Sequence, residues 1–495
     1  MNRSSRRSLA TAIAFLGALC SAACAVPLAP AYRIVKESQE VRFVPGPPPE
    51  LQVRAHFTLE NSGNSELTFI DVIFPNERAY GRRGLRVEID GRGITPVNLP
   101  WEYQQDQPNA LRLPLDVPWQ RKQRRELAVE YGFVSPEDAG GRITLSAESF
   151  HLGPGGWFPQ PQPPRHALAP YPVRPRMSYT VRVPSDFLVL SDGARKGARK
   201  DGAETEYRFE VRSADLPPYV VAGHYSEWPQ KRGERSTVFW TMQPLKEDAG
   251  AAAERIRGAW EILEKEFGPL GKNTAVPHVV ESPTVRGHFV AEDGPAAASF
   301  PGGVLVNPAA LSLGSTSERF VELVTHALAR RWFDEEMAPA PQAVLGMGEG
   351  LPEYAVMVVE EARDGAAGRQ RRVLRYLNEY DAAAKETPEK PLGAIAMSDP
   401  AAARRMGLAK AALFYAALED ACGPGPMRTG LAQMVARLRG RDTGYDALRS
   451  ALEESSGRNL AELFRVWVNG KGIPKEFRER YAPHATGQGN TPWNF

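Results

Sequence analysis

Residues 324–333 read VTHALARRWF, and residues 346–354 read GMGEGLPEY. The first stretch lies within Glu318–Phe333, where the apolar spacing predicts an amphipathic helix. On such a helix His326 and Arg330 are four residues apart and share one face. Eighteen residues separate Arg330 from Glu349. The pattern therefore puts a histidine and a guanidinium on one helix face, and a carboxylate at a defined distance downstream.

This spacing is typical of a zinc peptidase motif. In a helical H-E-x-x-H, two histidines four residues apart reach one zinc ion and the glutamate acts as general base. The two stretches resemble those of the aminopeptidase N (membrane alanyl aminopeptidase) family of gluzincin metallopeptidases, whose third zinc ligand begins a downstream E-G-F-A-E-Y. The resemblance puts His326, Arg330 and Glu349 at the family zinc-ligand positions and Ala327 at the general-base position.

Further segments are similar to the same family, in the same order along the chain. They are WFP at 157–159, PPYVVAG at 217–223, KAALF at 410–414, and the stretch from 451 to 474 that ends in GIP. The resemblance covers roughly residues 150–475. It implies an α+β multidomain protein with an N-terminal antiparallel β domain, followed by a mainly helical, thermolysin-like (gluzincin) peptidase domain.

The catalytic groups of the family are missing from this chain. Ala327 has no group that could accept a proton from zinc-bound water, and Arg330 has no lone pair to offer a metal. Alignment on Lys410 puts Leu408 at the position of the family's transition-state-stabilising tyrosine. The family's G-x-M-E-N segment is not found, and residues 302–306 are predicted to occupy its strand. The resemblance therefore implies a degenerate site and an inactive enzyme.

Electrostatics also argue against zinc. At ~4 Å an arginine and a Zn²⁺ ion repel each other by about 8 kcal/mol at an effective dielectric of roughly 20. We therefore expect no metal and no other cofactor, with His326 and Glu349 as the ligands if zinc does bind. The guanidinium fork suits a carboxylate, so we expect Arg330 to pair with Glu349 in the metal's place, with their charged groups within about 6 Å of each other.

Hydrophobic periodicity divides the chain into two halves. Residues 51–59 alternate apolar and polar, as do segments near 85–89, 177–183 and 207–211, which predicts strands. Eight prolines between 154 and 175 predict irregular chain, in which Trp157 and Phe158 are buried. From about residue 230 the period is helical, with helices expected around 256–267 and near 351–364, 369–386, 402–421, 427–439, 444–455 and 459–468. The basic run RQRR at 369–372 is expected on a helix surface.

The N-terminus predicts export. Three arginines precede an apolar stretch at residues 9–19, and Ala23-Cys24-Ala25 fits a cleavage site before Val26. Two alternatives stay open: plain secretion, or a lipid anchor on Cys24, because residues 21–24 resemble a bacterial lipoprotein box. Ser5-Arg6-Arg7 leaves the general and the twin-arginine export routes open. No later segment is apolar enough to span a bilayer. The predicted parts are a signal peptide at 1–25, a β domain at 26–228, a peptidase-type domain at 229–480 and a tail at 481–495.

The charge composition argues against one class of partner, nucleic acids. The chain has 495 residues, with 61 Lys and Arg against 59 Asp and Glu, so it lacks the basic surplus of nucleic-acid binders. The favoured function is an exported, periplasmic or extracellular, non-catalytic aminopeptidase-like protein that binds a peptide or protein or serves as a scaffold. One alternative is an active zinc aminopeptidase with a remodelled site. The other is a structural envelope lipoprotein.

Overall fold

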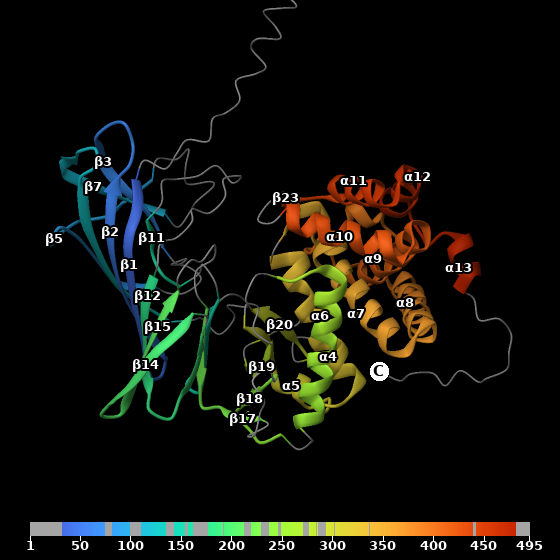
Figure 1. Ribbon diagram of the computed structural model, residues 1–495, viewed down its shortest axis with the longest axis horizontal. Helices are drawn as coiled ribbons and strands as arrows, with labels where there is room; N and C mark the ends of the chain where they lie inside the picture. The colour runs from blue at the N-terminus through green and yellow to red at the C-terminus, as the bar shows by residue number, and fades with distance from the viewer. Residues whose placement is uncertain are drawn as a thin grey trace, which may run out of the picture.

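The computed structural model describes residues 32–74, 82–99, 110–134, 143–153, 157–161, 177–191, 193–211, 219–228, 237–245, 249–270, 277–283, 285, 294–300, 302–335, 337–438 and 442–481. Within these ranges an N-terminal β-rich part is followed by a helical part, with a small sheet between them (Figure 1). The architecture is the mixed α+β arrangement that the sequence predicts.

The largest sheet of the β domain has eight strands in the order β14-β15-β12-β1-β2-β8-β4-β5. Along β2 the apolar residues face the core and the polar ones face outward, as their alternation predicts. The sheet is not antiparallel throughout, because β1 pairs in parallel with β12. The strands are β1 (Tyr32–Val44), β2 (Glu50–Asn61), β4 (Arg83–Ile89), β5 (Arg92–Gly93), β8 (Arg124–Phe133), β12 (Met177–Pro184), β14 (Ala194–Asp201) and β15 (Glu204–Val211).

Two four-stranded sheets complete the β domain. One has the order β13-β16-β10-β9 and the other β11-β3-β7-β6. The proline-rich segment contributes the short strand β11 at a sheet edge, and Trp157 and Phe158 are buried as predicted. The strands are β3 (Leu67–Ile73), β6 (Val97–Asn98), β7 (Ala110–Trp119), β9 (Ile143–Leu145), β10 (Ser149–Leu152), β11 (Gln160–Pro161), β13 (Leu188–Ser191) and β16 (Val220–Gly223).

A five-stranded mixed sheet opens the second half and was not predicted from periodicity. Its order is β17-β18-β19-β21-β20, with β18, β19 and β21 mutually parallel and β17 and β20 antiparallel to their neighbours. Residues 303–306, predicted as the strand in place of G-x-M-E-N, form the interior strand β21, and β20 is the edge strand. The strands are β17 (Ser226–Trp228), β18 (Phe239–Thr241), β19 (His278–Glu281), β20 (Ala297–Phe300) and β21 (Gly303–Val306).

Most helices agree with the predicted ranges to within a few residues, but α4 begins earlier than predicted, α5 and α13 were not predicted, and the range 459–468 is α-helical only in α12. They are α4 (Ala249–Phe267), α5 (Pro308–Leu311), α6 (Glu318–Arg330), α7 (Gly350–Asp364), α8 (Ala366–Glu386), α9 (Ala401–Cys422), α10 (Pro424–Leu438), α11 (Tyr445–Ser456), α12 (Ala461–Phe464) and α13 (Lys475–Tyr481). Two short 3₁₀ helices are η2 (Pro341–Ala343) and η4 (Leu392–Ala394). Two two-residue strands, β22 (Ala338–Pro339) and β23 (Asp442–Thr443), pair in parallel.

Three wider, π-helical turns interrupt the helical part. They are η1 (Arg331–Glu335), η3 (Val344–Glu349) and η5 (Arg465–Asn469). The first directly follows Arg330 at the end of α6, and the second ends at Glu349 and leads into α7. Such turns are often found at functional sites.

Several sequence predictions lie outside the described residues. The export signal at 1–25, the cleavage site and Cys24 precede them, and residues 482–495 of the predicted tail follow them. Within the described part, none of the helices has both the length and the apolarity that crossing a membrane would require.

Candidate functional site

Helix α6 carries the first half of the motif. Ser317 caps its N-terminus by accepting a hydrogen bond from the backbone N–H of Phe320 at 3.2 Å. One face of α6 packs against β20 and β21 and is fully buried, including Val324 and Ala327. His326 and Arg330 lie on the face that meets α7, and their side chains are about one-fifth exposed.

Glu349 is positioned by tight packing at the junction of η3 and α7. Gly350 lies so close to α9 that a Cβ on it would be 2.6 Å from Cβ of Ala411. Tyr415 of α9 donates a hydrogen bond to the backbone oxygen of Gly346 at 2.8 Å. α9 therefore fixes the backbone around Glu349 and directs its carboxylate toward α6.

The structure brings the three predicted positions together. Glu349 Oε2 is 3.1 Å from His326 Nε2, and Glu349 Oε1 is 3.5 Å from Arg330 Nη1. The predicted Arg330–Glu349 ion pair is therefore present. The Glu349 side chain is only 4% exposed, so water compensates little of its charge.

A fourth charged residue, Glu353, was missed by the sequence analysis. Its Oε1 lies 3.0 Å from Nδ1 of His326 and forms an ion pair with it. The geometry of this contact does not meet the requirements of a hydrogen bond. Tyr376 of α8 donates a hydrogen bond to the other carboxylate oxygen of Glu353. Helical spacing could have identified it, because Glu353 follows Glu349 by four residues and so shares its helix face.

The two glutamates keep His326 charged. Burial alone would lower the pKa of His326, but the charge of Glu353 and the hydrogen bond to Glu349 raise it to about 9. Burial alone would raise the pKa of Glu353, but the charge of His326 and the Tyr376 hydroxyl lower it to about 2. At neutral pH the charged imidazolium therefore has a carboxylate within 3.1 Å of each ring nitrogen. With Arg330, the four residues form a cluster without net charge, hereafter the His326 cluster.

These residues do not fit the zinc ion that the motif would otherwise imply. Glu349 and Glu353 contact opposite edges of the His326 ring, so one ion cannot touch all three side chains. Among the described residues, no three His, Cys, Asp or Glu side chains are placed to share a metal. Arg330 directs a cation at the carboxylate that a metal would need.

The side chains at the predicted general-base and tyrosine positions are both apolar. Ala327 is fully buried in the apolar core. Leu408 is on α9, one residue after Gly407, which packs against Leu345. Neither side chain can take part in a proton transfer or stabilise a developing charge.

The cluster continues into a second set of charges. Arg372 of α8 is 3% exposed, and its guanidinium lies 5.9 Å from the ring centre of Tyr376. It forms ion pairs with Glu360 of α7 and with Glu322 of α6 at 2.7 Å. Arg372 therefore belongs to the interior and not to the helix surface where the sequence analysis placed the run 369–372.

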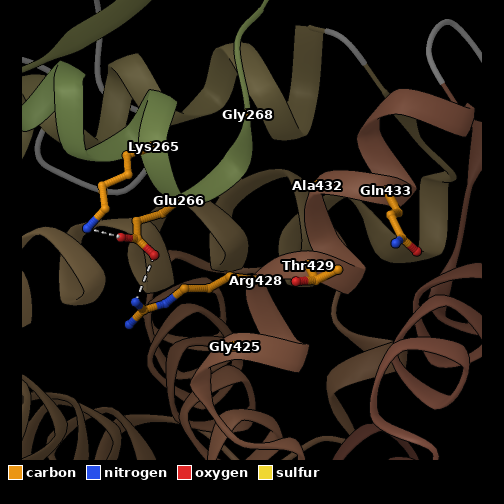
Figure 2. Close-up of a pocket in the computed structure, with 8 residues that line it drawn as sticks. All are labelled: Lys265, Glu266, Gly268, Gly425, Arg428, Thr429, Ala432 and Gln433. Carbon is orange, nitrogen blue, oxygen red and sulfur yellow. Dashed lines mark hydrogen bonds and ion pairs between the residues drawn. The ribbon is translucent and has the colours of Figure 1, made fainter.

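A surface groove of about 440 Å³ lies away from this cluster, between the end of α4 and helix α10. Figure 2 shows that Glu266 forms ion pairs with both cations at its wall, Lys265 at 3.3 Å and Arg428 at 2.7 Å. None of the His326 cluster residues lines it. Because its charges are paired with one another, the groove gives no evidence of a reaction.

Comparison with known proteins supports the fold. No protein-family model and no curated protein sequence matches the chain. An M1 zinc metallopeptidase from Deinococcus radiodurans matches in structure over 90% of this chain and 95% of its own, with a TM-score of 0.60 and 18% identity. Legionella pneumophila aminopeptidase A matches over 91% of this chain and 50% of its own, with a TM-score of 0.60 and 12% identity. The protein thus has the two-part fold of the M1 zinc metallopeptidases.

Proposed function

We propose that this protein is a divergent member of the aminopeptidase N family that has lost zinc peptidase activity. The observation that supports this most directly is the His326 cluster. Where the family motif would hold a metal between two histidines and a glutamate, Arg330 and an imidazolium pair with Glu349 and Glu353. Every charge has an opposite neighbour, so the arrangement is stable without an ion.

We further propose that the region beside the cluster binds a peptide or an extended protein segment. β20 is the edge strand of its sheet and packs beside α6, so on its outer side it has no neighbouring strand within the described residues. An open edge can add an extended chain through backbone hydrogen bonds. A mutant of the Deinococcus metallopeptidase has been solved with a Tyr-Ser-Ala substrate, which makes that tripeptide a suitable probe.

The proposed location is outside the cytoplasm. It follows from the N-terminal arginines, the apolar stretch and the cleavage pattern before Val26. Mass spectrometry of the mature N-terminus separates the two export alternatives. An unmodified Val26 start would exclude the structural lipoprotein anchored through Cys24.

Zinc content tests the loss of activity. Zinc per mole of the purified mature protein is measured by elemental mass spectrometry, before and after a zinc soak, in buffer without chelator. We expect a ratio near zero in both samples. A ratio near one that falls in His326→Ala or Glu349→Ala would instead support an active enzyme with a remodelled site.

The tripeptide tests binding and cleavage together. Calorimetry should detect heat of binding for Tyr-Ser-Ala, and liquid chromatography after prolonged incubation with added zinc should show the tripeptide intact. Release of free tyrosine above a protein-free blank would contradict the non-catalytic proposal. Absence of binding would remove the peptide-binding part and leave a scaffold role.

A further inference from the structure

Strand β14 differs from the other strands of the β domain in composition. It reads ARKGARKD, an Ala-Arg-Lys unit given twice, and all eight residues are exposed. It is the terminal strand of the eight-stranded sheet, and Figure 1 shows its hairpin with β15 at the lower end of the β domain. Within the described residues it pairs only with β15, so its outer backbone N–H and C=O groups are open to a further strand.

Two of the four cations of β14 are compensated by β15. Lys196 lies 2.9 Å from Glu210, and Arg199 lies 3.8 Å from Glu206. Arg199 is opposite Glu206 in the strand register, so this pair points to the solvent-facing side of the sheet. These two cations therefore add little free charge to the edge.

The other two cations point to the opposite face, where no described residue pairs an acidic group with them. Arg195 is opposite Phe209, and Lys200 is opposite Thr205. Arg195 lies 4.7 Å from the ring centre of Tyr207, an aromatic contact that leaves its charge uncompensated. Neither Arg195 nor Lys200 makes an ion pair with any described residue. One face of the open edge thus presents two unpaired cations.

We propose that β14 is a docking edge for an extended acidic segment of a partner protein. Such a segment would add beside β14 as a ninth strand and place carboxylates at alternate residues, on the face that holds Arg195 and Lys200. The same cations repel a second copy of β14, so the edge selects against self-pairing.

Charge distribution favours a single acidic chain over a broad anionic surface such as a membrane. The cationic strip is one strand wide. A wide anionic surface laid against this end of the sheet would find little free positive charge on the neighbouring strand β15, because Arg208 of β15 is paired with Glu206, and the other β15 carboxylates, Glu204 and Glu210, are also in ion pairs. A single extended chain along the edge would contact β14 alone.

Binding of a short peptide of Glu-Thr repeats to the mature protein tests this surface, with fluorescence anisotropy as the readout. The Arg195→Gln/Lys200→Gln variant should bind about tenfold more weakly, because each exposed ion pair contributes up to about fivefold. Since all of β14 is exposed, this variant should fold normally. Arg54→Gln/Arg124→Gln is the matched control: both arginines are 60% exposed on the same sheet and each has a glutamate partner at 3.1 Å.

Three further samples decide the mode of binding. The control variant and the charge-conserving Arg195→Lys/Lys200→Arg should bind within about twofold of wild type. A Glu-Thr peptide N-methylated at alternate backbone positions should lose binding, because it keeps the charge but cannot add as a strand. Equal binding of wild type and Arg195→Gln/Lys200→Gln, or equal binding of the N-methylated peptide, would overturn the proposal. So would β14-dependent binding to phosphatidylglycerol vesicles without peptide binding.

Discussion

His326 has an opposite charge at each of its ring nitrogens, and this distinguishes it from a surface histidine. The side chains of His326, Glu353, Arg330 and Glu349 are between 4% and 20% exposed. In such surroundings a charge that loses its partner is costly, because water replaces the partner only in part. The cluster therefore resists the loss of any member.

Replacing Glu353 tests this at a single position. Glu353→Gln keeps the size of the side chain but leaves Nδ1 of His326 without its carboxylate. We expect the free energy of unfolding to fall by about 2 kcal/mol, less than for a fully buried pair. Glu462→Gln is the control, because Glu462 is 72% exposed in its pair with Arg465, and it should change stability by less than about 0.5 kcal/mol. Urea unfolding measures both, and equal effects would contradict this account of the cluster.

His151 on β10 makes stability depend on pH. It is 6% exposed, packs edge-on against Phe300, and its ring nitrogens have no hydrogen-bond partner among the described residues. Burial lowers the pKa of His151 from 6.5 to about 4. Between these values the unfolded chain binds a proton that the folded chain does not. Stability that is complete above pH 6.5 is therefore lost as the pH falls toward 4, by about 3 kcal/mol in all.

A comparison with His151→Leu isolates this contribution from other titrating groups. Between pH 7 and pH 5, wild type should lose about 2 kcal/mol more unfolding free energy than the variant. Chemical denaturation at the two pH values gives the four free energies needed. If both proteins lose the same amount, His151 does not titrate as described.

At the scale of elements, local periodicity predicted the helices because each needs an apolar face. It did not predict where α6 ends, since the turn at Arg331–Glu335 depends on a distant partner: Trp332 donates a hydrogen bond to the backbone oxygen of Gly268. The burial of Arg372 was missed for the same reason. Its partner Glu322 is 50 residues away in the chain, on another helix. Contacts between residues so far apart in the chain cannot be predicted from local hydrophobic periodicity.

Adjacent arginines on α8 provide a matched test of that burial. Arg372→Met leaves Glu360 without its ion-pair partner, whereas Glu322 keeps its ion pair with Arg375 at 2.7 Å. The loss of the buried Arg372–Glu360 pair should lower the free energy of unfolding by about 3 kcal/mol. Arg371→Met removes a side chain that is 61% exposed, and should change it by less than about 0.5 kcal/mol. Thermal or urea unfolding distinguishes the two. Similar losses of stability in the two variants would mean that Arg372 is a surface residue like Arg371.

For the whole molecule, the order of a β half and a helical half could be predicted, because periodicity is continuous over long stretches. The five-stranded sheet could not, since strands as short as Phe239–Thr241 have no measurable period. The parallel pairing of β1 with β12 joins segments more than a hundred residues apart. At the site, the Arg330–Glu349 pair could be predicted from the motif, whereas the contribution of Glu353 required a view of both helices together.

The chain matches the M1 fold over 90% of its length at only 18% identity, so this fold is formed by widely different sequences. Changing the site alone should then leave the fold intact. In this chain Glu349 already faces His326 Nε2, and Glu353 contacts Nδ1 on the far side of the ring. A carboxylate in that second position orients a metal-binding histidine and strengthens it as a ligand. We therefore propose that Arg330 is the main obstacle to zinc binding.

Replacing Arg330 tests this directly. Arg330→His removes the cation and supplies a third ligand, so this variant should take up about one zinc per chain after a zinc soak. Arg330→Gln removes the cation without supplying an imidazole and should stay near the wild-type ratio. Both ratios come from elemental mass spectrometry. The zinc-loaded variant should still not cleave Tyr-Ser-Ala, because Ala327 provides no general base. If Arg330→His takes up no zinc while it unfolds like wild type, the backbone geometry around α6 and α7 has diverged along with the ligands.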